Sequence, residues 1–77
     1  MTLNDLGAVL EKMYRNAPAN ESVAMIHLFG IQYAEQIKNL NVSCKALAKA
    51  AGINESYGTE ISKGIKLSKY VAVKVRT

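Results

Sequence analysis

Several kinds of residue are scarce in this chain of 77 residues, which has one cysteine, one proline, one histidine and no tryptophan. A single cysteine excludes an internal disulfide and a cysteine-rich metal site. We therefore expect the fold to be held by apolar packing or by association with a second copy, in a reducing, cytoplasmic setting. No apolar run approaches the roughly 18 residues of a membrane span, and the N-terminus lacks the pattern of a signal peptide. These absences predict a protein that is neither secreted nor membrane-embedded.

The short length limits the range of functions. A chain of this size forms one domain, here expected to be residues 1–77, and removes only roughly 60% of its surface from water on folding. His27 lies among apolar residues and has no partners at metal-ligand spacing. Cys44 has no base and orienting group nearby in the sequence, and no glycine-rich phosphate motif occurs. We therefore expect no enzyme activity, cofactor, metal or small-molecule ligand.

Charge is distributed unevenly along the chain, although the net charge of +4 is modest. Residues 1–40 have a net charge of −1, whereas residues 41–77 have a net charge of +5. The basic residues of the second half are Lys45, Lys49, Lys63, Lys66, Lys69, Lys74 and Arg76. A basic half-domain can face nucleic acid, an anionic membrane surface or an acidic protein, and charge alone does not choose among them.

Apolar residues recur at helical spacing through the first half of the chain. A helix is predicted from Thr2, where Thr2 and Asp5 form a candidate capping box and Asn4 is a competing cap, and it ends before Pro18. A second, continuous helix is predicted over residues 21–40, apolar over most of its circumference and therefore central. Gly30 within this helix indicates the close approach of another backbone.

The second half of the chain contains shorter elements. Ser43 can cap a helix over residues 44–51, and Asn54 can cap another over residues 55–63, with Gly64 as its stop. Valines alternate with other residues from Tyr70 onwards, which predicts a short strand at residues 69–75. The predicted fold is therefore all-α, with about four helices and a short C-terminal β-strand. Residues 1–40 form its supporting helices.

Residues 44–63 have the internal spacing of a helix-turn-helix, so we assign this motif to residues 43–64. Ala48 and Gly58 are small where the two helices cross, and Gly52 allows the left-handed backbone of a tight turn. The apolar wedge between the helices consists of Leu47, Ala51, Ile53 and Ile61. This pattern resembles the helix-turn-helix of bacterial and phage DNA-binding proteins.

A second stretch, from Tyr57 to Gly64 and on through Lys69-Tyr70-Val71, is similar to small bacterial and prophage helix-turn-helix-like domains. Some domains of that kind are fused ahead of nuclease domains. The resemblance covers residues 5–71 and includes no nuclease motif, so it implies a DNA-binding module alone. Such a module would act in transcription regulation or as a phage-type accessory factor.

In a helix-turn-helix the start of the second helix approaches base edges, and surrounding cations contact phosphates. The predicted base-contacting residues are Ser56, Thr59, Glu60 and Lys63. The predicted phosphate-contacting residues are Lys45, Lys49, Lys66 and Lys69. We expect a homodimer on double-stranded DNA, joined through the second helix of the chain, predicted over residues 21–40, or through the C-terminal strand.

Two carboxylates on the second helix of the motif, Glu55 and Glu60, oppose this interpretation because they repel phosphates. The alternative is a protein-interaction module, in which the basic face docks an acidic partner and the helices are only a scaffold. A basic stripe along the second helix would favour DNA, and an exposed apolar patch would favour protein.

Overall fold

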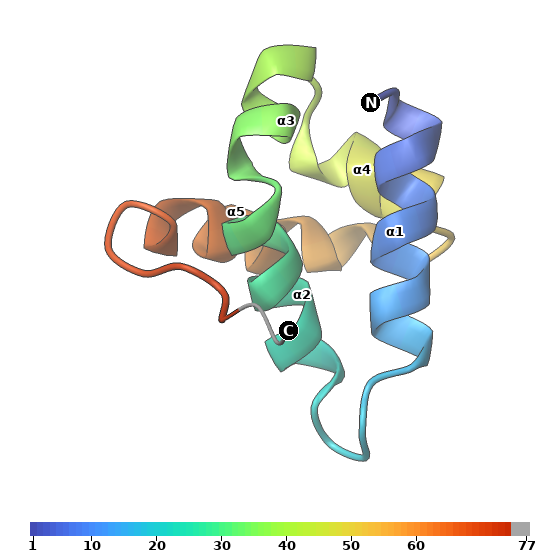
Figure 1. The fold of residues 1–77 in the computed structure, drawn as a ribbon. Coiled ribbons are helices and arrows are strands. Elements are labelled where there is room, and N and C mark those ends of the chain that lie inside the picture. Colours follow the sequence, from blue (N-terminus) through green and yellow to red (C-terminus); the bar gives the residue numbers. More distant parts are fainter. Residues whose placement is uncertain (75–77) are drawn as a thin grey trace.

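The computed structural model describes residues 1–74 and folds them into helices packed around one core (Figure 1). A short 3-10 helix at Glu55–Tyr57 leads into the last α-helix. The α-helices are α1 (Leu3–Arg15), α2 (Ser22–Gln32), α3 (Ala34–Leu40), α4 (Cys44–Ala50) and α5 (Gly58–Leu67). Within residues 1–74 no helix has the length and apolar character needed to cross a membrane.

The start of α1 confirms the predicted capping box. The backbone N–H of Asp5 donates to the Thr2 hydroxyl at 3.1 Å, and the backbone N–H of Thr2 donates to the Asp5 carboxylate at 2.9 Å. These bonds hold the pKa of Asp5 below its ordinary value, with the backbone bond from Thr2 as the main cause. The helix then buries Leu6 and Leu10 completely. Thr2, rather than Asn4, is therefore the cap.

The continuous helix predicted over residues 21–40 is wrong, because the chain bends at Tyr33 between α2 and α3. Tyr33 has φ −110° and ψ 19°, outside the α-helical region, although its N–H still donates to the Phe29 carbonyl. The bend allows α3 to bury Ile37 in the same cluster as Phe29 and Ile61. Tertiary packing determines this break, and the helical periodicity of the segment contains no signal for it.

The helix-turn-helix is built as its local signals predict. The Ser43 hydroxyl caps α4 by accepting from the Ala46 N–H, and the Asn54 side chain accepts from the Ser56 N–H. Between them Gly52 has φ +73°, a left-handed conformation that side-chain-bearing residues rarely adopt. The segment after the turn begins with the 3-10 helix and continues as α5.

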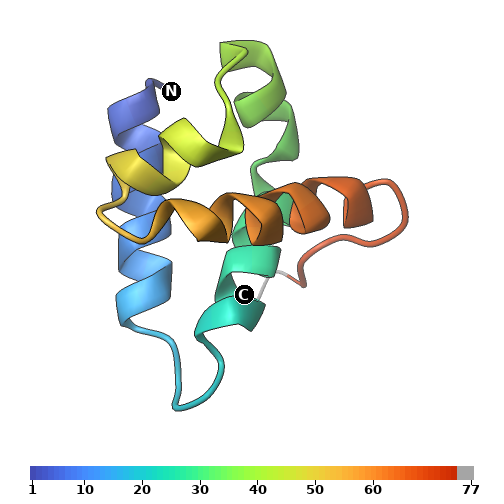
Figure 2. The same cartoon turned by 180° about the vertical axis from the view of Figure 1, so that it is seen from behind.

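The predicted helix end at Gly64 is wrong, because α5 continues to Leu67. Gly64 is instead buried at the contact of α5 with α2, and Figure 2 shows these two helices crossing. A Cβ atom at Gly30 would lie 2.6 Å from the Ile61 carbonyl oxygen, and one at Gly64 would overlap the His27 carbonyl oxygen. Both glycines thus permit backbone contact between the two helices, as expected for Gly30 and unexpected for Gly64.

The predicted C-terminal strand is also wrong, because residues 1–74 contain helices and turns but no strand. After α5 the chain turns back, with the N–H groups of Tyr70 and Val71 donating to the Leu67 carbonyl. The following residues lie near the end of α2, where Ile31, Gln32 and Val71 line one hollow. A strand needs a hydrogen-bonding partner strand, and none is present within residues 1–74. Val75 lies outside the described residues.

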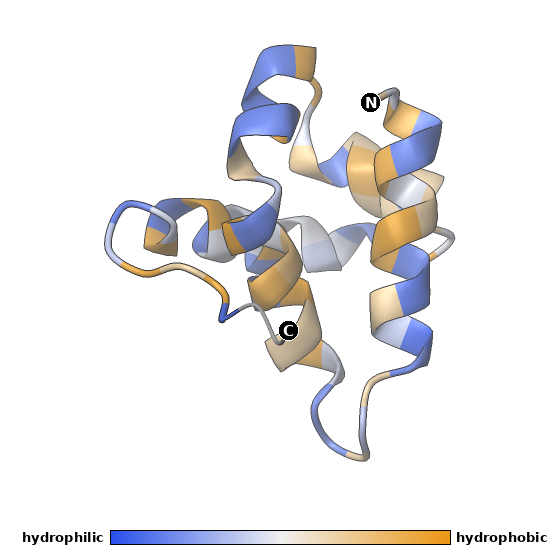
Figure 3. Ribbon diagram, in the orientation of Figure 1, coloured by the Kyte–Doolittle hydropathy of each residue, from blue (hydrophilic) through white to orange (hydrophobic). Residues whose placement is uncertain are grey.

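The core joins the helix-turn-helix to its supporting helices. In Figure 3 apolar and polar residues alternate along α1, whereas α2 is apolar over most of its length. Accordingly α2 packs against both α1 and α5, the central position that the sequence predicts. The largest completely buried side chains are Phe29, Leu6, Leu10, Ile26, Leu47 and Ile61. This core fixes the position of α5 on the surface of the domain.

The crossing of α2 and α5 can be tested with Gly64→Ala. Alanine favours a helix by about 1 kcal/mol over glycine, but its methyl group would collide with backbone atoms of α2. We expect a net loss of about 1–3 kcal/mol in the free energy of unfolding, measured by urea denaturation. The control is Lys66→Ala at an exposed position of the same helix, which should change stability by less than about 0.5 kcal/mol. A Gly64→Ala protein as stable as the wild type would contradict the close backbone contact between α2 and α5.

Candidate nucleic-acid interface

One side of α5 faces away from the other helices (Figure 2) and carries exposed residues. Its buried residues are Gly58, Ile61 and Gly64, which point toward the core. Thr59, Lys63 and Lys66 are exposed, and their spacing of four and three residues places them on one helical face. The face opposite the core is therefore polar and basic.

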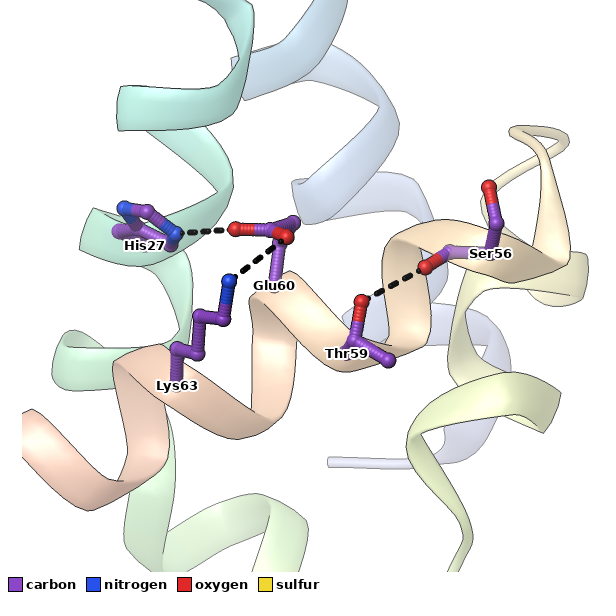
Figure 4. Close-up of polar contacts among 5 residues, drawn as sticks. All are labelled: His27, Ser56, Thr59, Glu60 and Lys63. Carbon is purple, nitrogen blue, oxygen red and sulfur yellow. Dashed lines mark hydrogen bonds and ion pairs between the residues drawn. The ribbon is translucent and has the colours of Figure 1, made fainter.

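Ser56 and Thr59 lie at the beginning of this face (Figure 4). The Thr59 hydroxyl donates to the Ser56 carbonyl oxygen at 2.9 Å, which leaves the lone pairs of the hydroxyl oxygen available to accept. Both residues are exposed. The two predicted base-contacting hydroxyls thus lie within one turn of each other and face solvent.

Glu60 lies beside this face but contacts the protein itself (Figure 4). Its Oε1 is 2.7 Å from Nε2 of His27 on α2, and its Oε2 accepts from Nζ of Lys63 at 3.2 Å. The hydrogen bond with His27, followed by the one with Lys63, holds the pKa of Glu60 below its ordinary value of 4.5. With its side chain only 21% exposed, this carboxylate is less accessible than the other predicted base-contacting residues.

The contact between His27 and Glu60 was not predicted from the sequence. The two residues are 33 positions apart and meet only because α2 crosses α5 at Gly30 and Gly64. The sequence shows His27 among apolar residues and does not identify a partner for its ring. Among residues 1–74 no group of three or more potential metal ligands comes together.

The second carboxylate that opposed DNA binding, Glu55, is paired as well. Its Oε2 lies 3.3 Å from Nζ of Lys45, and both side chains are substantially exposed. Such a pair contributes little to stability, typically about 0–1 kcal/mol. Together with the Lys63–Glu60 pair, it nevertheless places a cation beside each of the two glutamates of the motif, which reduces their repulsion of an approaching phosphate.

The remaining predicted phosphate-contacting lysines are divided between different surfaces. Lys49 is exposed in the last turn of α4, and Lys66 is exposed on α5. Lys69 lies on the side of α5 that faces α3, where it lines a hollow with Glu35 and Lys38. Lys63 and Lys66 together line a separate hollow. The structure therefore brings Lys63 and Lys66 together but not Lys69.

The base of the motif is fixed by close packing and by an aromatic pair. A Cβ atom at Gly58 would lie 3.1 Å from the backbone nitrogen of Lys45, which confirms the close approach of α4 and α5. Tyr57 packs on Tyr14 of α1 with ring centroids 5.5 Å apart. The contact with the Tyr14 hydroxyl raises the pKa of Tyr57. These contacts fix the start of α5 against α1 and α4.

The contacts of Glu60 predict how stability depends on pH. The folded protein lowers the pKa of this carboxyl, so its ionised form stabilises the fold above pH 4.5, and this contribution is lost as the pH falls through the lower folded-state value. The loss in unfolding free energy caused by Glu60→Gln should thus be larger at pH 7 than at pH 3 in urea denaturation. Glu35→Gln, at an exposed position of α3, removes the same charge and is the control, with a similar small effect expected at both pH values. An equal loss at both pH values would contradict the assignment.

Comparison with known proteins agrees with this geometry. The model of a protein family described as an HTH-like domain, where HTH denotes helix-turn-helix, matches residues 2–74. No curated protein and no solved structure matches the chain significantly. The matched range includes α1 to α5 and thus both the supporting helices and the motif. The chain therefore belongs to the HTH-like domain family, and this membership indicates DNA binding by a helix-turn-helix.

Proposed function

We propose that this protein binds double-stranded DNA with the outer face of α5 in the major groove. The observation that supports this most directly is the exposed series Thr59, Lys63 and Lys66 on the second helix of the motif. A helix of ten residues is about 15 Å long, and the major groove, about 12 Å wide, admits an α-helix. The exposed series lies opposite the buried residues of α5, so the groove can be entered without disturbing the core.

The base contacts come from the 3-10 helix and the start of α5 in this proposal. Ser56 and Thr59 are exposed hydroxyls that can donate to or accept from several bases. Lys63 is 63% exposed and can reach a guanine or a phosphate. The bonds of Glu60 to His27 and Lys63 support an internal role for this carboxylate, which orients the Lys63 ammonium group.

The phosphate contacts come from both helices of the motif. Lys45 and Lys49 extend from α4, the helix that lies across the DNA backbone in this geometry, and Lys66 extends from α5. Lys69 lies on the side of α5 that faces α3, so it would contact a phosphate only if the DNA extended to that side. These contacts supply affinity and salt dependence rather than sequence information.

The biological role that we propose is transcription regulation or a phage-type accessory function, performed by a homodimer. A two-fold dimer would double the contacts of a domain this small. Because residues 1–74 contain no strand, the proposed seam is α2, where Val23 is 40% exposed. The alternative of a protein-interaction module is supported by a different observation, the exposed apolar side chains of Leu67 and Tyr70.

Substitution of single lysines tests the proposed surface. Lys49→Ala and Lys63→Ala should each weaken binding to a labelled random duplex, and each loss of a phosphate contact should lower the slope of log affinity against log salt by about one. Fluorescence anisotropy at several salt concentrations measures both quantities. Lys12→Ala removes the same charge from an exposed position of α1, outside the proposed surface, and should reduce affinity less. If all three variants had the affinity and the salt slope of the wild type, the proposed DNA-binding surface would be wrong.

Base preference tests the division of roles between Thr59 and Glu60. Selection of bound duplexes from a random pool should give a changed preference for Thr59→Ala. Glu60→Gln should keep the wild-type preference and bind all duplexes more tightly, because it removes a negative charge and releases Lys63 from its ion pair. A lost preference for cytosine in Glu60→Gln would instead make Glu60 a base-contacting residue.

A further inference from the structure

A shallow hollow of about 360 Å³ lies beside the C-terminal end of α5, on the side facing α2. Its lining consists of His27, Lys63, Lys66, Leu67 and Tyr70. Of these residues only Lys63 and Lys66 have a part in the proposed DNA contacts. We call this feature the Tyr70 hollow.

The apolar side chains of the Tyr70 hollow do not serve the core. Leu67 is 42% exposed and Tyr70 is 83% exposed, and neither belongs to the buried cluster or to the residues packed against it. Tyr70 is held in place by its backbone, whose N–H donates to the Leu67 carbonyl at 2.9 Å. An exposed tyrosine beside an exposed leucine is typical of a contact surface.

The charges around the Tyr70 hollow restrict its occupant. Lys63 and Lys66 line it, and no carboxylate does so within residues 1–74. Glu60 contacts two of the lining residues, but its carboxylate already binds both of them, His27 and Lys63. A second copy of this chain seated on the same hollow would bring two pairs of lysines together, which is unfavourable. The surface therefore suits an anionic occupant that also offers apolar groups.

The hollow is continuous with the proposed DNA-binding face. Thr59, Lys63 and Lys66 follow one another on α5 at spacings of four and three residues, and both lysines also line the hollow. A duplex lying along α5 would extend from Thr59 to the hollow. Its backbone alternates phosphates with deoxyribose rings, which present apolar C–H groups, so it matches lysines placed beside an apolar floor.

We infer that the Tyr70 hollow receives the sugar–phosphate backbone of the duplex bound by α5. The ammonium group of Lys66 contacts a phosphate, and the side chains of Tyr70 and Leu67 pack against the adjacent deoxyribose. This inference rests on the proposed function and adds Leu67 and Tyr70 to the residues that bind DNA. An acidic peptide is the other anionic occupant, but it would have no reason to extend along Thr59 and Lys63.

The salt dependence of binding separates these contacts. A lysine at a phosphate displaces a counterion, whereas an apolar contact with a sugar does not. Tyr70→Ala should thus weaken duplex binding by at least about fivefold with an unchanged salt slope. Lys66→Ala should weaken binding and lower the slope by about one. Tyr70→Phe keeps the ring and should bind as the wild type does.

The experiment is anisotropy with a labelled random duplex at several salt concentrations, with circular dichroism to verify folding. Val71→Ala removes an exposed apolar side chain that does not line the hollow and is the matched control, with wild-type affinity expected. If the wild type binds the duplex and Tyr70→Ala binds equally well, the inference is overturned while the proposed function stands. If the folded wild type does not bind, the proposed function fails, and this inference with it. Unchanged duplex binding by Tyr70→Ala, with loss of binding to an acidic leucine-containing peptide, would overturn the inference in favour of a protein partner.

Discussion

The close crossing of α2 and α5 at Gly30 and Gly64 is the constraint on which the rest of the structure depends. The backbones approach so closely that a Cβ atom at either glycine would collide with the facing helix. This contact fixes which side of α5 is buried and leaves the opposite side to solvent. It also brings His27 to 2.7 Å from Glu60, so that a carboxylate on the proposed DNA-binding helix is bound internally. The chemistry of the outer face thus follows from the packing of the inner face.

Signals that act within a few residues could be predicted from the sequence. Thr2, Ser43 and Asn54 cap their helices because a side-chain oxygen there can reach a backbone N–H two or three residues ahead. Gly52 forms the turn because glycine adopts a left-handed backbone at low cost. The helix-turn-helix itself, and with it the family, could therefore be identified before the structure. The exposure of Ser56 and Thr59 depends on the same local geometry.

Features that depend on contacts between distant segments could not be predicted. The bend at Tyr33 and the burial of Gly64 both arise from tertiary packing, and glycine alone does not distinguish a helix end from a helix crossing. The alternating valines after Tyr70 satisfy the pattern of a strand, but the described chain offers no partner strand, so the segment up to Lys74 remains irregular. Likewise, the contact of His27 with Glu60 requires knowledge of how α2 crosses α5.

The central claim is that the outer face of α5 binds duplex DNA, and mapping the contact surface on the folded protein tests it most directly. Amide chemical shifts of isotopically labelled protein, recorded while a short duplex is added, would identify the residues at the interface. We predict that the largest changes fall within residues 55–70 and in α4, with small changes in the first two turns of α1. Changes concentrated on α1 and α3, or none at low salt, would contradict the account.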